Sequence, residues 1–196
     1  MNGHTKTAQQ SRTWLLDAYF ELLTTHRDET ITVTTIAATA DLSRRTFYRF
    51  FNNKSDLLNY YGQQLLSSYD QYLATLDTKT ATFNEIMVLF FNFIWDHRRR
   101  LRILIRQNLF MARLPELMAP AIARYQALAV SWHAAQTPAQ IQLIMTFALG
   151  GYWNVVNDWL MADDPVAPTE IANNLLLILN KLLSTSSPLT DNNQDQ

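Results

Sequence analysis

Hydrophobic residues recur at helical spacing along most of the chain. In residues 8–26 the apolar positions at i, i+3, i+4 and i+7 are Leu15, Ala18, Tyr19 and Leu22. Comparable patterns predict helices over residues 33–40, 44–51, 55–76, 82–97, 98–112, from a break at Pro115–Pro120 to about 135, 138–160 and 168–183. The pattern therefore predicts an all-α fold with about nine helices.

Polar residues that favour helix starts divide the N-terminal part into short units. Thr32 and Ser43 each precede a short apolar-periodic segment, and each hydroxyl is able to accept a bond from the first helical turn. Asp41 and Leu42 form the predicted turn between the two segments. A helix followed by two short helices around a turn is the helix-turn-helix arrangement. We expect a helix-turn-helix domain at residues 1–58, a C-terminal helical bundle at 59–184 and a polar tail at 185–196.

The composition supports helices and excludes several other classes. Gly and Pro number only 4 and 6 of 196 residues, whereas their average combined usage is about 12 %. That scarcity argues against a sandwich or barrel joined by tight turns. Apolar residues make up 48 % of the chain, enough for a sizeable core. Cysteine is absent, so disulfide frameworks, cysteine-ligated zinc and cysteine nucleophiles are excluded.

Charge is concentrated on the second short helix. The formal net charge is −1, yet Ser43 to Lys54 contains four basic residues and no acid. Phe47 and Phe51 stand at i and i+4 and are predicted to anchor this helix to the core. The opposite face then presents Arg44, Arg45, Tyr48 and Arg49. Arginine side chains match guanine edges and phosphates, so this face is predicted to contact DNA. The alternatives are a solvated helix face and, for the tyrosine, a place in the core.

Four segments resemble the DNA-binding domain of the tetracycline-repressor (TetR/AcrR) family. They are TVTTIA at 32–37, ADLS at 40–43, FYRFF at 47–51 and KSDL at 54–57. The resemblance covers about residues 8–60. The chain departs from the family pattern at Asp41, where Gly is usual, and at Arg45, where a small residue is usual. Asp tolerates left-handed backbone geometry, so we expect the turn to persist.

The resemblance implies a homodimeric transcriptional regulator, usually a repressor, in the bacterial cytoplasm. Its N-terminal helices are expected to bind double-stranded operator DNA. A small molecule in the C-terminal domain is expected to change the separation of the two DNA-binding units. The residues expected to face DNA are Thr34, Ser43, Arg44, Arg45, Thr46, Tyr48, Arg49 and Lys54. Among them, Tyr48 and Lys54 are expected to contact phosphates.

The two C-terminal helices are apolar on most sides. Residues 125–180 carry only four charged side chains, all acidic and close to one loop. A helix that is apolar around most of its circumference requires burial on most sides, and interface centres are poor in charge. We therefore expect these helices to pack against a second copy of the chain. The candidate contact residues are Gly151, Val155, Trp159, Leu175, Ile178 and Leu182.

An effector pocket is expected among the aromatic residues of the bundle. The candidates are Phe90, Phe93, Trp95, His97, Phe110, Trp132 and His133, with Phe83, Tyr125 and Asn154 as further aromatic or polar candidates. The expected effector is apolar or aromatic, because such pockets are mostly apolar. For any single residue, ordinary core packing is the alternative.

Other chemistry has no support in the sequence. The four histidines show no metal-ligand spacing, and there is no phosphate-binding glycine loop or serine nucleophile motif. No enzyme activity, metal or cofactor is expected, and no membrane span or targeting segment is predicted. A second basic cluster at 98–106 is interpreted as favourable charge near a helix end, ahead of DNA contact. The alternative function is a helical ligand-binding or interaction module that does not bind an operator.

Overall fold

The computed structural model describes residues 3–77, 80–112, 114–127 and 137–184. Every regular element in these ranges is helical, which confirms the all-α prediction. There are ten α-helices and one 3₁₀ turn, η1, in these ranges, rather than nine helices.

The first five elements are α1 (Gly3–Leu23), η1 (Asp28–Thr30), α2 (Val33–Thr39), α3 (Arg44–Phe50) and α4 (Lys54–Leu73). The remaining elements are α5 (Phe83–Asp96), α6 (Arg98–Arg106), α7 (Leu109–Ala112), α8 (Leu114–Ala127), α9 (Pro138–Met161) and α10 (Pro168–Ser184). We call α1 to α3, with η1, the head, and α5 to α10 the body.

The predicted helix starts of the head are confirmed. The Thr32 side chain accepts a bond from the backbone of the first turn of α2, and Ser43 does the same for α3. Asp41 has a φ of 53°, so the aspartate adopts the left-handed geometry that the turn requires. The predicted start of α4 at Ser55 is wrong by one residue. The side chain of Asn53 caps the helix, and Lys54 is its first residue.

Two boundaries in the body differ from the prediction. The segment 98–112 is two helices, because Asn108 has a φ of 57° and ends the helical path between α6 and α7. The predicted break between Pro115 and Pro120 is absent, and α8 runs through both prolines. Pro115 lies in the first turn, where no backbone donor is needed, and Pro120 removes one bond without ending the helix.

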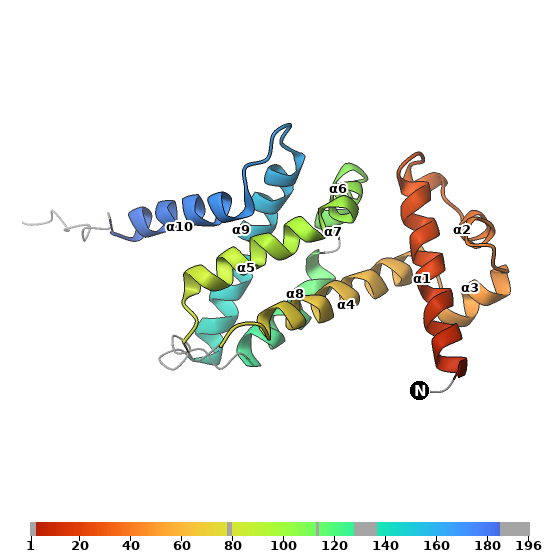
Figure 1. The fold of residues 1–196 in the computed structure, drawn as a ribbon, viewed down its shortest axis with the longest axis horizontal. Coiled ribbons are helices and arrows are strands. Elements are labelled where there is room, and N and C mark those ends of the chain that lie inside the picture. Colours follow the sequence, from red (N-terminus) through yellow and green to blue (C-terminus); the bar gives the residue numbers. More distant parts are fainter. Residues whose placement is uncertain (1–2, 78–79, 113, 128–136, 185–196) are drawn as a thin grey trace, which may run out of the picture.

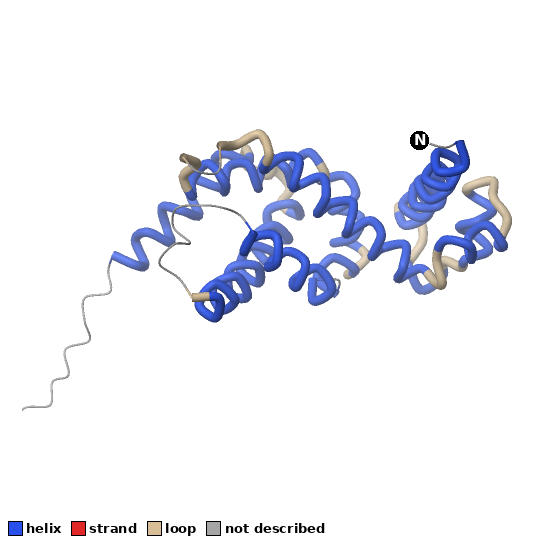
Figure 2. The backbone as a smooth tube through the Cα atoms, turned by 90° about the horizontal axis from the view of Figure 1, so that it is seen from below, coloured by secondary structure: helices blue, strands red, loops and turns tan. Residues whose placement is uncertain are grey.

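A single long helix joins the head to the body. In Figure 1, α1 to α3 gather at one end of the molecule and α4 runs from them into the body. The helix continues unbroken through residue 58, where the sequence predicted a domain boundary. Figure 2 shows the same arrangement from a perpendicular direction, with short loops between most helices. One apolar cluster includes buried residues of both the head and the body.

The C-terminal helices lie beside α5. α10 packs along α5, and α9 packs against α8 and α6. No helix in the described ranges has the length and hydropathy needed to cross a bilayer.

Candidate nucleic-acid interface

One face of α3 is fixed in the core of the head. Phe47 is fully buried and Phe51 nearly so, with their ring centroids 5.7 Å apart. Leu15 of α1 and Ile36 of α2 are also fully buried in the same cluster. The predicted anchoring of α3 by its aromatic pair is therefore confirmed.

The opposite face of α3 is exposed and basic. Arg44, Arg45 and Arg49 are all exposed. Tyr48 is 50 % exposed, so it is not a core residue. The Arg44 guanidinium lies 5.9 Å from the centroid of the Tyr48 ring, and a cation over an aromatic face is attracted to it. The face thus presents charge and a phenol to solvent.

The three hydroxyl residues differ in their roles. Thr34 is exposed on α2. Ser43 and Thr46 bond to each other through their side-chain oxygens at 2.9 Å, and Ser43 caps α3. Both are therefore explained locally by helix capping, and contact with DNA remains a prediction for all three.

An arginine outside the predicted set lies beside α3. The Arg12 guanidinium lies 4.9 Å from the centroid of Phe50, and the Arg49 guanidinium lies 4.6 Å from the same centroid. Arg12 belongs to α1, far from α3 in the sequence, so no local pattern indicates this contact. It adds a cation beside the basic face.

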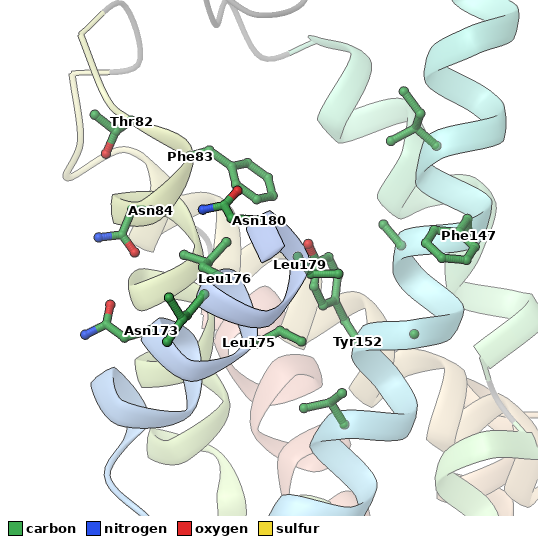
Figure 3. A pocket seen from close by; sticks show the side chains of 15 residues that line it. Thr82, Phe83, Asn84, Phe147, Tyr152, Asn173, Leu175, Leu176, Leu179 and Asn180 are labelled. Carbon is green, nitrogen blue, oxygen red and sulfur yellow. The ribbon is translucent and has the colours of Figure 1, made fainter. Parts of the chain in front are cut away.

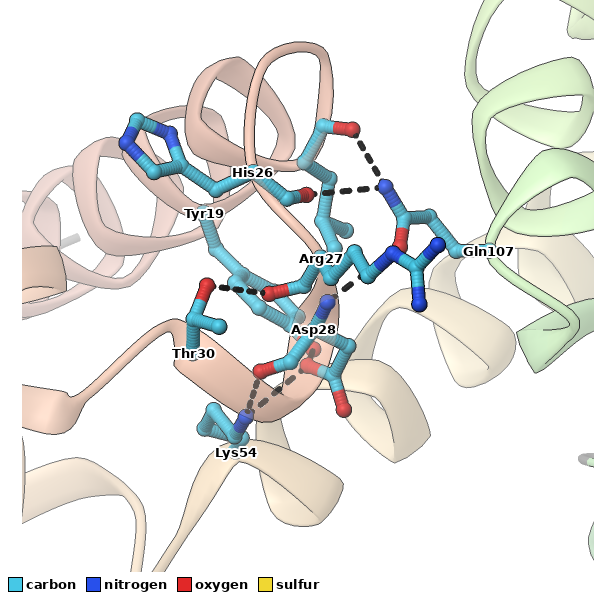
Figure 4. Close-up of polar contacts among 8 residues, drawn as sticks. Tyr19, His26, Arg27, Asp28, Thr30, Lys54 and Gln107 are labelled. Atoms are coloured by element: carbon cyan, nitrogen blue, oxygen red, sulfur yellow. Dashed lines mark hydrogen bonds and ion pairs between the residues drawn. The ribbon is translucent and has the colours of Figure 1, made fainter.

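Lys54 is partly buried and already paired within the protein. Its Nζ lies 2.9 Å from Asp28 Oδ1, and it also donates to the backbone carbonyl of Asp28 (Figure 4). The hydroxyl of Tyr19 donates to the same carboxylate. Because the Lys54 side chain is only 24 % exposed, its predicted phosphate contact requires it to reach past this ion pair.

Gln107 connects the body to this cluster. Its amide nitrogen donates to the carbonyls of Leu23, at 2.8 Å, and His26, at 2.9 Å. Its amide oxygen accepts a bond from the Asp28 backbone N–H at 3.2 Å (Figure 4). Neither Gln107 nor Asp28 was found from the sequence, because nothing in the local pattern of either residue indicates a contact so distant along the chain.

The second basic cluster serves internal packing. Arg98 donates to the carbonyl of Trp95 at 2.7 Å, and its guanidinium lies 4.3 Å from the Trp95 ring centroid. Arg100 is ion-paired with Asp17 of α1. The Arg102 side chain donates to the Leu160 carbonyl of α9 at 2.8 Å. These three arginines tie α6 to its neighbours.

Most of the aromatic pocket candidates belong to the core. Phe93 is buried and lies 4.3 Å, between ring centroids, from His97, whose Nδ1 is 2.9 Å from the Phe93 carbonyl. Trp95 stacks on Trp159 with centroids 5.5 Å apart. Phe90 is half-buried against other aromatic rings. These contacts support the core-packing alternative for Phe90, Phe93 and Trp95, while His97 also lines an open cleft of mixed polar and apolar character.

Other candidates lie in different settings. The Asn154 side chain is exposed and donates to the Gly150 carbonyl at 2.8 Å. Tyr125 is half-buried on α8. Trp132 and His133 lie outside the described residues.

Phe110 lines a small internal slot between α4, α6, α7, α8 and α9. The slot has a volume of about 30 Å³ and is lined almost entirely by apolar side chains. Tyr61 also lines it, and its buried hydroxyl has no hydrogen-bond partner among the described residues. Burial raises the pKa of Tyr61 above its usual value, and the nearby Arg100 lowers it by a smaller amount. The phenol therefore stays neutral.

A larger apolar groove lies between α5, α9 and α10. Its volume is about 1050 Å³, and Phe83, Phe147 and Tyr152 point toward it from two of these helices (Figure 3). Phe147 is 79 % exposed, an unusual degree for a phenylalanine. A Cβ built on either Gly150 or Gly151 would meet no described atom within 4 Å.

The dimer candidates divide into two groups. Gly151, Val155 and Leu175 line the groove, and Ile178 is exposed nearby on α10. The prediction for Trp159 is wrong, because this residue is buried in the core of the single chain and its indole N–H donates to the Val166 carbonyl at 2.9 Å. The side chain of Leu182 lies outside the described part of the chain.

Comparisons with known proteins identify the N-terminal domain and the fold. Residues 15–61 match the family model of bacterial regulatory proteins of the tetR family. A TetR transcriptional regulator from Streptococcus agalactiae is similar in structure, with a TM-score of 0.61 and 16 % identity over 91 % of this chain and 99 % of that chain. The fatty acid degradation regulator FadR from Bacillus halodurans is also similar, with a TM-score of 0.56 and 19 % identity over 86 % of this chain and 93 % of that chain.

A third solved structure extends the likeness. The TetR family repressor AlkX from Dietzia sp., implicated in n-alkane biodegradation, has a TM-score of 0.53 and 20 % identity over 88 % of this chain and 95 % of that chain. No curated protein matches the chain in sequence. At these identities the structures establish the fold, and the family model establishes the DNA-binding domain. Residues 15–61 are thus a DNA-binding domain of the bacterial tetR family, and the fold of the chain is similar to that of solved TetR-family regulators.

Proposed function

We propose that this protein is a ligand-responsive repressor that binds a near-palindromic operator as a homodimer. The observation that carries the proposal is the outer face of α3. Its three arginines are exposed, and none forms an ion pair with a described residue. A major groove admits a helix, and arginine bonds in bidentate fashion to guanine, so this face suits base recognition. A DNA partner implies a location in the bacterial cytoplasm.

The groove between α9 and α10 supports the homodimer. Its exposed apolar side chains on α9 and α10 are Ile144, Phe147 and Leu177, and no charged residue lines the groove. A two-fold interface brings the same patch of each copy together, so an apolar, uncharged patch is complementary to itself. Adjacent glycines within a helix destabilise it by about 1 kcal/mol each relative to alanine. Within a single chain no contact offsets this cost, because the space beside both glycines is open. A partner helix packed closely against them would offset it.

The internal slot beside Tyr61 supports an effector site in the body. Its apolar lining suits the apolar or aromatic molecule that we propose. Pockets for such ligands span about 300 Å³ or more, whereas the slot has about 30 Å³. An effector therefore binds there by moving helices apart. That movement would give it a differential affinity for two conformations, which regulation requires.

The test is operator binding by charge-matched variants. An operator selected from random duplexes gives the reference affinity, with a slope of log affinity against log salt of about −4 to −5 for four to six phosphate contacts. The double variant Arg44→Ala/Arg49→Ala should lose about 1–3 kcal/mol per base contact and relax base preference. The control Arg99→Ala/Arg106→Ala removes the same charge from exposed positions of α6. Equal losses for the two variants, or none for the first, would favour the interaction-module alternative.

A further inference from the structure

Lys54 already forms an ion pair with Asp28, an acidic residue of the head. The ammonium lies 2.9 Å from Asp28 Oδ1 and also donates to the Asp28 carbonyl. An ammonium has three donors, so two of the three are used within the protein. The carboxylate offsets the charge of Lys54 and repels a phosphate brought to the same place.

Asp28 is itself held from two sides. The Tyr19 hydroxyl donates to its carboxylate from the core of the head. The Gln107 side chain accepts a bond from its backbone N–H and donates to the carbonyls of Leu23 and His26 at the end of α1. A residue of the body therefore fixes the turn that carries Asp28 (Figure 4).

Gln107 stands between two residues of the internal slot. Leu104 and Phe110, on either side of it in the chain, both line the slot. Gln107 lies in the corner between α6 and α7, so a widening of the slot that displaced Leu104 and Phe110 would also displace Gln107.

We propose that Asp28 is an inhibitory contact on DNA binding. It occupies Lys54 in the free protein and releases it to a DNA phosphate, and Gln107 sets how firmly the turn that carries Asp28 is held. This inference rests on the proposed function, because it assigns a regulation to the same DNA-binding site. A displacement of the α6–α7 corner changes the position of Asp28 and so the availability of Lys54.

The direct test is Asp28→Asn, measured on a duplex of random sequence. Asparagine has nearly the same size as aspartate but no charge. Its backbone N–H is still able to donate to the Gln107 side chain. Affinity should rise about 3- to 10-fold at moderate salt, as for a change in a partly exposed charge pair. The salt slope should steepen by up to about one unit per protomer, because each lysine then neutralises a phosphate. Unchanged or weaker binding would overturn the proposal.

Two controls separate this contact from general charge effects. Glu29→Gln removes one charge at the neighbouring exposed position without a bond to Lys54, and it should leave the affinity nearly unchanged. Combined with Lys54→Ala, the Asp28→Asn substitution should no longer raise the affinity. An equal gain from Glu29→Gln, or a gain that persists without Lys54, contradicts the proposal. If the amide lowers stability, Asp28→Ser repeats the measurement.

The role of Gln107 is tested by non-additivity. Gln107→Leu should alter DNA affinity in the wild-type background and leave it unchanged in Asp28→Asn, since residues that act through one another couple. Gln71→Leu, at an exposed position of α4, is the matched control. Additive effects of Gln107→Leu and Asp28→Asn would overturn this step. Absence of duplex binding by the wild type would contradict the proposed function itself, a result distinct from any of these.

Discussion

The buried hydroxyl of Tyr61 has no partner among the described residues. Its ring packs edge-on against Phe20 of α1, with centroids 4.9 Å apart, and lies under the Arg100 guanidinium at 5.6 Å. Burying a hydroxyl without a hydrogen bond costs about 1–3 kcal/mol. The ring therefore stabilises the junction of head and body while the oxygen opposes it.

Tyr61→Phe should raise the free energy of unfolding by about 1 kcal/mol, because it removes the oxygen and keeps the ring. Chemical denaturation of the two proteins measures the difference. Tyr72→Phe is the control, since the Tyr72 hydroxyl donates to Asp96 at 2.5 Å and its removal should bring no gain. A loss of stability in Tyr61→Phe would mean that the hydroxyl is bonded, for example to water.

Residue patterns predicted which arginines of α3 are exposed, but not the tertiary contacts around Lys54. The i, i+4 spacing of Phe47 and Phe51 determined which face of α3 is buried, and hence which face is exposed. Asp28 bonds to both Lys54 and Gln107, and each pair joins residues distant in the chain. No periodicity encodes such pairs, because they depend on how separate helices come together.

At the scale of the element, capping residues predicted helix boundaries better than apolar periodicity did. Thr32 and Ser43 cap the helices they precede, because their hydroxyls satisfy backbone donors that would otherwise be unpaired. Periodicity alone merged α6 and α7, since the apolar face continues across Asn108, whose positive φ ends the helix. A proline is a local signal too, but α8 shows that it does not always end a helix.

Gly151→Arg should separate the proposed homodimer into folded single chains. The groove position is open, so the arginine fits the protomer without a clash. In the dimer it would place a charge in an apolar seam, which is costly without a partner. The dissociation constant from analytical ultracentrifugation should rise on the order of 100-fold.

The control for this substitution is Gln142→Arg. Gln142 is exposed, lies on the opposite side of α9 from Gly151 by helical geometry, and does not line the groove. Its dissociation constant should match that of the wild type. A wild type that remains monomeric at micromolar concentration would contradict the interface.

At the scale of the whole molecule, the continuous helix α4 connects the head to the body. The helix begins with Lys54, after the turn that follows α3, and ends within the body beside α5. One apolar cluster continues from the head into the body. The hydrogen bonds of Gln107 add a second, polar connection between the same parts. A conformational change in the body is therefore able to move the head in two ways, through α4 and through the hydrogen bonds of Gln107.

A homodimer of this protein should require a defined spacing between its two DNA half-sites. The two α3 helices are related by a two-fold axis, so each enters a major groove, and the half-sites lie about one helical turn or somewhat more apart. Inserting about 5 base pairs at the centre of the selected operator turns the half-sites to opposite faces of the duplex. Affinity should then fall to that of a single half-site, measured on a duplex with one half scrambled. If the inserted operator binds as tightly as the original, the two heads do not contact DNA as one rigid dimer.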